Sequence, residues 1–341
     1  MLIPNTVLRS RDIVLLSGHD LRHLLRPQAA IEALRETYAA LADNRADQGR
    51  SIAFKVDSGS IHVKSGLLPG SHLAFASKIN VNLPENLRLH GLPTIQGVVL
   101  VADAKNGNPL AIMESITLTG IRTAATAALA AGYGAKPNSR RAAIVGCGAQ
   151  ARYQLEALRC VFPLDQVRVF DIVQERAEAY AAEMSTPTCP VLSVLSVRAA
   201  VDGADICVTC TTSQSAILTD DMDLSGCFVA AVGADNPEKQ EIAPALMRRA
   251  RVLVDDLDAC AIGGDLKHAL QAGTITREQV HADLADLAAG RKVGRMSEVE
   301  LVIFDTSGSG VQDVAAAWAA YREALRLGVG SRFDLTGHST D

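Results

Sequence analysis

Apolar positions in the second half of the chain fall in short runs separated by stretches with helical spacing. Residues 142–145 are apolar, residues 167–170 are apolar except for Arg168, and both runs predict strands, with a helix predicted between them at 150–160. Further strands are expected at 191–195, 205–209, 227–232, 251–255 and 301–304, with helices at 174–184 and 198–203. Strands that alternate with helices in this way predict an α/β fold with a doubly wound parallel sheet of the Rossmann type.

The first half of the chain has a different pattern. Residues 50–64 alternate loosely between apolar and polar and predict two antiparallel strands, and three more strands are expected at 73–80, 96–102 and 110–113. A long alanine-rich helix at 117–134 leads into the parallel sheet, and a terminal helix at 311–327 is expected to pack back on the first half. We therefore predict a smaller α+β domain formed by residues 1–121 and 310–341, and a Rossmann domain formed by residues 122–309.

A glycine-rich turn follows the strand at 142–145. Its sequence fits G-x-G-x-x-A and opens a helix, which is the context of a dinucleotide-binding turn. The first glycine permits the sharp turn, and the second has no Cβ to block a pyrophosphate, which the N-terminus of the helix attracts. The candidate cofactor-binding residues of this turn are Gly146, Gly148, Ala149 and Gln150.

Asp171 ends the second strand of this unit, at the spacing where an acid binds the hydroxyl groups of the adenosine ribose. A carboxylate there would repel the 2′-phosphate of NADP, so the motif favours NAD over NADP. Thr211 and Thr212 follow another strand of the sheet, and Ser307 follows the last one. Because ligands bind beyond the carboxyl ends of parallel strands, these three residues are further candidates for cofactor contacts.

Composition excludes several classes of partner. The net charge is -5, so the chain has no general basic surface for nucleic acid. No apolar run reaches the length of a membrane span, and no secretory signal pattern is found, so a cytoplasmic protein without membrane contact is expected. Cys207 and Cys210 form a C-x-x-C pattern inside a strand, and His19 and His23 lie four apart. Neither pair has further ligands nearby, so no metal site is predicted.

Taken in order, several segments make the chain similar to the ornithine cyclodeaminase/mu-crystallin superfamily. They are residues 78–80 with 84–86, 91–94, 107–111, 121–125, the glycine-rich turn, 232–235 and 304–308. The resemblance implies a homodimer in which a substrate and dimerisation domain is joined to an NAD(P)-binding domain. It further implies a small amino or imino acid as the substrate.

The resemblance also assigns roles to single residues. Lys78 corresponds to the active-site lysine, Asp235 to the catalytic aspartate and Arg122 to the arginine that binds the substrate carboxylate. Arg50 corresponds less clearly to a second carboxylate-binding arginine. These roles agree with the chemistry: a guanidinium binds a carboxylate with two parallel hydrogen bonds, and burial lowers the pKa of a lysine enough for proton exchange. Thr123, next to Arg122, is a further candidate for a cofactor contact.

Three functions remain open at this point. The first is net redox chemistry, in which NADH reduces an α-imino acid or the reverse reaction oxidises an amino acid. The second is cyclodeamination of ornithine to proline and ammonia, with recycled NAD. The third is a non-catalytic NAD(P)-binding protein similar to mu-crystallin, which the retention of Lys78, Arg122 and Asp235 disfavours.

One departure from the family pattern favours net redox. Ornithine cyclodeaminases have a glutamate, facing the distal ammonium of ornithine, in the strand before the active-site lysine. Here the similar strand has His62 and Lys64, which share one face. A cationic wall disfavours a substrate with a second ammonium and favours a neutral or acidic side chain. We therefore expect an imine reductase or amino-acid dehydrogenase, with an imino dicarboxylate such as iminosuccinate as a candidate substrate.

Overall fold

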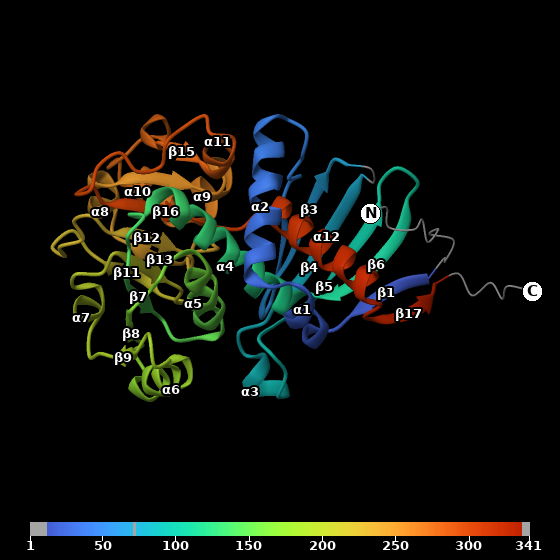
Figure 1. The fold of residues 1–341 in the computed structure, drawn as a ribbon, viewed down its shortest axis with the longest axis horizontal. Coiled ribbons are helices and arrows are strands. Elements are labelled where there is room, and N and C mark those ends of the chain that lie inside the picture. Colours follow the sequence, from blue (N-terminus) through green and yellow to red (C-terminus); the bar gives the residue numbers. More distant parts are fainter. Residues whose placement is uncertain (1–11, 71–72, 336–341) are drawn as a thin grey trace, which may run out of the picture.

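A computed structural model describes residues 12–70 and 73–335 of the chain. Two sheets lie side by side, and the helix α4 (Ser115–Gly134) runs between them (Figure 1). The protein therefore has the α/β architecture that the sequence predicted. The proposed domain boundaries stay a prediction, and the outermost residues of the first domain, 1–11 and 336–341, lie outside the described part.

The larger sheet has eight strands in the order β15-β14-β16-β12-β10-β7-β8-β9, and every pair in it is parallel. From β7 the chain winds outward through β8 and β9 and then returns to place β10 on the other side of β7. This reversal creates a crevice beyond the carboxyl ends of β7 and β10. The bounds are β7 (Arg141–Val145), β8 (Gln166–Phe170), β9 (Val191–Ser193), β10 (Ile206–Thr209), β12 (Phe228–Ala231), β14 (Arg251–Val254), β15 (Ala282–Asp283) and β16 (Val302–Asp305).

Helices cover both faces of this sheet, so its central strands are buried throughout and read as continuous apolar runs. The helices are α5 (Ala149–Val161), α6 (Gln174–Met184), α7 (Val197–Val201), α8 (Pro244–Arg249), α9 (Leu257–Gly263), α10 (Asp265–Gln271) and α11 (Leu284–Ala288), with one 3₁₀ turn, η1 (Arg277–Gln279). A small parallel pair, β11 (Gln214–Leu218) and β13 (Gln240–Ile242), lies apart from the main sheet. The sequence patterns did not predict this pair or the short helices α8 to α11.

The second sheet has seven strands in the order β17-β1-β6-β5-β4-β3-β2. Strands β2 to β6 form an antiparallel meander, β1 lies parallel to β6, and β17 closes the edge antiparallel to β1. Their bounds are β1 (Asp12–Leu16), β2 (Ile52–Val56), β3 (Gly59–Leu68), β4 (Ala74–Asn82), β5 (Ile95–Asp103), β6 (Asn108–Glu114) and β17 (Ser331–Asp334). The antiparallel meander agrees with the predicted strands, whereas β17 was not predicted.

Helices α2 (Pro27–Ala42) and α12 (Gly310–Leu327) lie on one face of this sheet (Figure 1), and α12 contacts β3 and β4, as expected for the terminal helix. Gly310 permits the close approach, because a Cβ at this position would lie 1.8 Å from the carbonyl oxygen of Ser65. The short helices α1 (Gly18–Leu24) and α3 (Asn86–His90) complete this half. Within the described residues, none of the helices is both long and apolar enough to cross a membrane.

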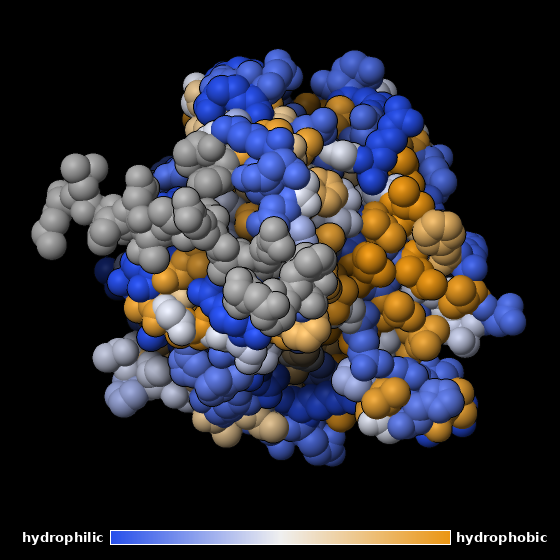
Figure 2. All heavy atoms as spheres, turned by 90° about the vertical axis from the view of Figure 1, so that its right-hand side faces the viewer, coloured by the Kyte–Doolittle hydropathy of each residue, from blue (hydrophilic) through white to orange (hydrophobic). Residues whose placement is uncertain are grey.

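The opposite face of the seven-stranded sheet is apolar and exposed. Ile52, Val63, Ile79 and Val98 are successive cross-strand partners and therefore form one row. Ile52, Ile79 and Val98 are 52%, 45% and 46% exposed, and Phe54 on β2 is 54% exposed. Figure 2 shows apolar side chains gathered on this side of the molecule. A monomer rarely exposes such a continuous apolar surface, so this face has the character of an interface.

Candidate active site

The glycine-rich turn after β7 has the geometry that a dinucleotide requires. Gly146 has a φ of 94°, and a Cβ there would lie 2.8 Å from the Thr211 side chain, so only glycine fits. By contrast, a Cβ at Gly148 would meet nothing within 4 Å, which leaves open space in front of the turn. Gly148 and Ala149 are exposed where α5 begins. The turn therefore offers an anion backbone N–H groups that have no acceptor among the described residues.

Asp171 lies directly beside this turn. One carboxylate oxygen accepts a hydrogen bond from the backbone N–H of Cys147 at 2.9 Å, and the other accepts one from Val173 at 2.9 Å. These bonds fix the carboxylate at the end of β8, where the sequence predicted it. The next residue, Ile172, is 92% exposed and offers an apolar surface for a flat ring. The sequence analysis did not select Ile172. An apolar residue in the loop directly after Asp171 could have indicated a contact with the cofactor.

The other candidate cofactor residues differ in their accessibility. Thr211 donates its hydroxyl to the buried carboxylate of Glu241, which also accepts from Thr209 and from the N–H of Gly233. Glu241 thereby ties together the ends of β10 and β12. Thr212 is exposed, Thr123 is buried on α4, and Ser307 is buried after β16. Gln150 lies in the turn with its Oε1 buried and without a hydrogen bond to described residues.

Lys78 and Arg122 converge on one carboxylate that the sequence analysis did not identify. Lys78 projects from β4, and its Nζ lies 2.8 Å from Oδ1 of Asp313 and 3.3 Å from the Thr119 hydroxyl. Nε of Arg122, from α4, lies 3.1 Å from the same oxygen. Burial lowers the pKa of Lys78 to about 7, although the charge of Asp313 opposes this shift.

Lys64 joins this group from the neighbouring strand. It is the cross-strand partner of Lys78, so both side chains lie on the face that packs against α12. Its Nζ donates to the carbonyl oxygens of Ser307 at 3.1 Å and Gly308 at 2.7 Å. Burial, followed by repulsion from Arg122, lowers the pKa of Lys64. Lys64, Lys78 and Arg122 therefore lie in one group, in which Lys78 and Arg122 pair directly with Asp313.

The loop between β16 and α12 forms the floor of this cluster. Oδ2 of Asp255 accepts hydrogen bonds from the Thr306 hydroxyl, the Gly308 N–H and the Gln312 side chain. Gln312 also donates to the Tyr38 hydroxyl and accepts a hydrogen bond from Nη1 of Arg122. Nη2 of Arg122 donates no hydrogen bond to the described residues. Nε and Nη1 are thus engaged by the protein, and Nη2 is the guanidinium nitrogen that is available to a ligand.

Asp235 lies in the loop after β12, at the carboxyl ends of the parallel strands. Its side chain is 54% exposed and pairs with Lys239 at 2.7 Å. Burial by the surrounding chain raises the pKa of Asp235, but Lys239 and Lys64 more than offset this effect, so the pKa is lowered. His62 is close enough to Asp235 and Lys64 for both charges to influence it, and burial lowers its pKa. Asp235 is therefore favoured as an ionised carboxylate, and it is near enough to Lys64 for that charge to contribute.

Arg50 is the predicted site residue with the least support. It is exposed in the loop before β2, and its side chain makes no hydrogen bond or ion pair with the described residues. This loop is nevertheless tied to the site region, because Asp47 pairs with Leu67 and the side chain of Gln48 donates to Asp256. The structure brings Lys64, Lys78 and Arg122 together, places His62 and Asp235 near enough for their charges to interact, and leaves Arg50 at the periphery.

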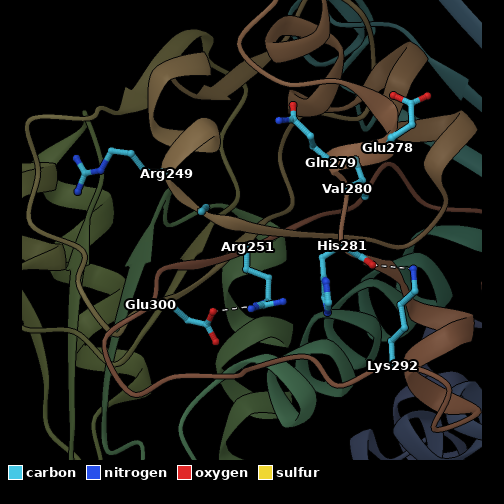
Figure 3. A pocket seen from close by; sticks show the side chains of 9 residues that line it. Arg249, Arg251, Glu278, Gln279, Val280, His281, Lys292 and Glu300 are labelled. Atoms are coloured by element: carbon cyan, nitrogen blue, oxygen red, sulfur yellow. Dashed lines mark hydrogen bonds and ion pairs between the residues drawn. The ribbon is translucent and has the colours of Figure 1, made fainter.

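A second hollow lies at the amino end of β14, away from the carboxyl ends of the parallel strands (Figure 3). Its lining includes Arg251, the first residue of β14, which pairs with Glu300 at 2.8 Å, and Lys292, which donates to the carbonyl of His281. Because ligands of such sheets bind beyond the carboxyl ends of the strands, this surface is not part of the site.

Fold and site together define an α/β protein with a dinucleotide-type turn and a buried cluster of cationic side chains. Residues 11–327 match the ornithine cyclodeaminase/mu-crystallin family, and the chain belongs to this family. The resemblance stated from the sequence is thereby confirmed.

Three solved structures are similar over nearly the whole chain. An archaeal alanine dehydrogenase dimer with bound NAD has a TM-score of 0.90 at 30% identity, over 95% of this chain and 99% of that one. The Thermococcus litoralis Δ1-pyrroline-2-carboxylate reductase, with NADH and L-proline, has 0.89 at 31%, over 94% and 99%. The Paracoccus denitrificans iminosuccinate reductase, with NAD+, has 0.86 at 27%, over 95% and 100%.

Proposed function

We propose that this protein is an NADH-dependent reductase that converts a small α-imino acid into an L-amino acid. The observation that carries the proposal is the convergence of Lys64, Lys78 and Arg122 in one buried cluster. Such a site suits a small anion rather than a diamine. The relatives named above include dehydrogenases and imine reductases, which supports the same class of reaction.

The residues around the turn fit a nicotinamide dinucleotide. Gly146 and the open space at Gly148 leave room for a pyrophosphate, and Asp171 presents a fixed carboxylate where the adenosine ribose would lie. The same carboxylate disfavours a 2′-phosphate, so NAD(H) is the proposed cofactor. When bound, this group supplies a hydride to the α-carbon of the substrate.

The chain's own residues would bind the substrate and manage its charge. Nη2 of Arg122, together with the second proton of Nη1, binds the substrate carboxylate, because a guanidinium fork matches its two oxygens. Lys78, with a pKa of about 7, holds a proton beside the reacting centre and can exchange it near neutral pH. The ionised carboxylate of Asp235 stabilises the protonated form of the substrate nitrogen, which is the more reactive electrophile.

We further propose an imino dicarboxylate, such as iminosuccinate, as the substrate. Lys64 and His62 follow each other along the site face of β3, next to Lys78 on the neighbouring strand, and can receive a second carboxylate. The Lys64 ammonium has bonds to two carbonyl oxygens and carries a third proton that none of the described residues accepts. The similar Paracoccus denitrificans protein is an iminosuccinate reductase, which supports this class of substrate.

Changing Lys64 to methionine tests this substrate class. The variant keeps an unbranched side chain one atom shorter than lysine and removes its charge. We expect kcat/KM for an imino dicarboxylate to fall roughly 10- to 100-fold relative to a monocarboxylate, because one charge-assisted hydrogen bond contributes about 1.5–3 kcal/mol. The ratio is measured with oxaloacetate and pyruvate, each with ammonium. Lys292→Met, far from the site, is the control, and an unchanged ratio in Lys64→Met would rule out this role.

We also propose that the protein is a homodimer that buries the apolar face of the seven-stranded sheet. The archaeal alanine dehydrogenase is described as a dimer, and the row of Ile52, Val63, Ile79 and Val98 gives this chain a continuous apolar surface for a second copy. This face lies on the other side of the sheet from Lys64 and Lys78. Dimerisation would therefore stabilise the strands that carry the site without covering it.

Introducing a charge into this face should break the dimer. Ile79→Glu places one carboxylate from each protomer in the dry interface. This costs several kcal/mol because neither charge is paired. Light scattering should give twice the chain mass of 36.0 kDa for the wild type and the monomer mass for the variant. Leu195→Glu, an 83% exposed apolar residue on the parallel-sheet side, is the matched control and should stay dimeric. A dimeric Ile79→Glu would place the interface elsewhere.

A further inference from the structure

The crossover segment, residues 306–313, runs from the end of β16 through the first turn of α12 and contacts all three cations of the site. Its carbonyl oxygens at Ser307 and Gly308 accept from Lys64, the Gln312 side chain accepts from Arg122, and Asp313 pairs with both Lys78 and Arg122. This segment links the two sheets, because it leaves the parallel sheet and enters the helix that packs on β3 and β4. The charge and orientation of the site therefore depend on a few residues of this crossover.

Asp313 is the central group of the crossover. Its side chain is only 1% exposed, and Oδ1 is shared between Nζ of Lys78 and Nε of Arg122. Oδ2 is buried and has no hydrogen-bond partner among the described residues. Burial raises the pKa of this carboxyl, but the charges of Lys78 and Arg122 more than offset the increase, so the pKa is lowered and the group stays ionised.

The groups that face Lys78 come from three elements. Arg122 and Thr119 approach from α4, Lys64 and the nearby His62 from β3, and Asp313 from α12. Arg122 and Lys64 are cations and disfavour a proton on Lys78, as does its burial. The charge of Asp313 acts in the opposite direction, at hydrogen-bond distance. Without that charge, the pKa of Lys78 would fall further and its neutral form would be favoured.

We infer that Asp313 is a positioning residue of the active site: it keeps Lys78 protonated and turns the Arg122 fork toward the substrate. The inference rests on the proposed function for its catalytic consequence, but the charge of Lys78 can be measured without turnover. Asp313 itself need not contact the substrate, because it acts through the two cations with which it pairs. No assignment drawn from the sequence gave this residue a role.

The test compares Asp313→Asn and Asp313→Glu in the full-length protein with NADH bound. Protein labelled with 13C at the ε carbon of lysine is titrated by NMR, and the Lys78 signal is identified by its absence in Lys78→Arg. We expect the Lys78 midpoint to fall by at least about one pH unit in Asp313→Asn, because a close opposite charge shifts a pKa by about 1–3 units. Asp313→Glu, which restores the charge in a displaced position, should lie between Asp313→Asn and the wild type.

Kinetics provide a second readout. The basic limb of kcat/KM should move to lower pH by the same amount as the NMR midpoint, and KM should rise as the Arg122 fork loses its support. Equal midpoints in all three proteins, with only reduced activity or stability in the variants, would overturn the inference. If Asp313→Asn does not fold, Asp313→Glu must still differ from the wild type. A shifted NMR midpoint in a protein that reduces no imine would instead refute the proposed function alone.

Discussion

Replacing Lys78 with methionine is expected to reduce imine reduction by about 1,000-fold while NADH still binds. The ammonium lies in the cluster with Arg122 and Asp313, and methionine fills its buried space without a charge or a proton. A positioned proton donor typically contributes a factor of about 10²–10⁴ to the rate. Steady-state kinetics and fluorescence titration with NADH separate the two effects.

Thr119→Val is the control for this prediction, because it removes a hydroxyl 3.3 Å from the same ammonium and leaves the charge in place. It should change the rate only slightly.

In the wild type, the reductive rate should fall as pH rises through about 7, since burial lowers the pKa of Lys78 to this value and the neutral amine dominates above it. A Lys78→Met variant that retained activity and the same pH profile would exclude the lysine from the chemistry.

Arg122→Lys should weaken substrate binding more than it slows the chemical step. Lysine keeps the charge but loses the planar fork, and its single ammonium cannot bond Gln312, Asp313 and a substrate carboxylate together. Loss of two charge-assisted hydrogen bonds at about 1.5 kcal/mol each corresponds to a KM roughly 100-fold higher. The measurement is KM for the imino acid at saturating NADH.

Arg159→Lys provides the matched control. Arg159 lies on α5 and donates to the carbonyl of Met184, away from the cleft, so the same substitution there should leave KM unchanged. If Arg122→Lys left KM unchanged while kcat fell, the carboxylate would have to be held by another residue. Arg50, exposed at the periphery, would then be the next candidate.

Local patterns predicted the parts of the fold that depend on neighbouring residues. The buried strand at 142–145 and the glycine-rich turn were legible because apolar runs and glycine spacing reflect local geometry. Strand β17 was missed because it forms only by pairing with β1 from the other end of the chain. The pair β11 and β13 was missed for the same reason, since its stability comes from contacts between segments rather than from periodicity.

The site was predictable only in part. Lys78, Arg122 and Asp235 were assigned roles through the family resemblance. The structure brings Lys78 and Arg122 together on Asp313, which the sequence analysis did not identify. Asp313 lies in the first turn of α12, where an acid is expected on helix-dipole grounds alone and is usually solvated. Its burial results from the way α12 packs on β3 and β4, which no local pattern reports. The partners of Lys64 are backbone carbonyls, which leave no signature in a sequence.

The most direct test of the proposed function is the loss of NADH absorbance in purified protein supplied with ammonium and a panel of 2-oxo acids, or with cyclic imines. NADPH in place of NADH tests the cofactor, and L-ornithine with NAD+ is assayed in parallel for proline and ammonia. The proposal predicts NADH oxidation that depends on one imine, fastest with oxaloacetate and ammonium. Proline and ammonia from ornithine, without net change in NADH, would contradict it and identify a cyclodeaminase.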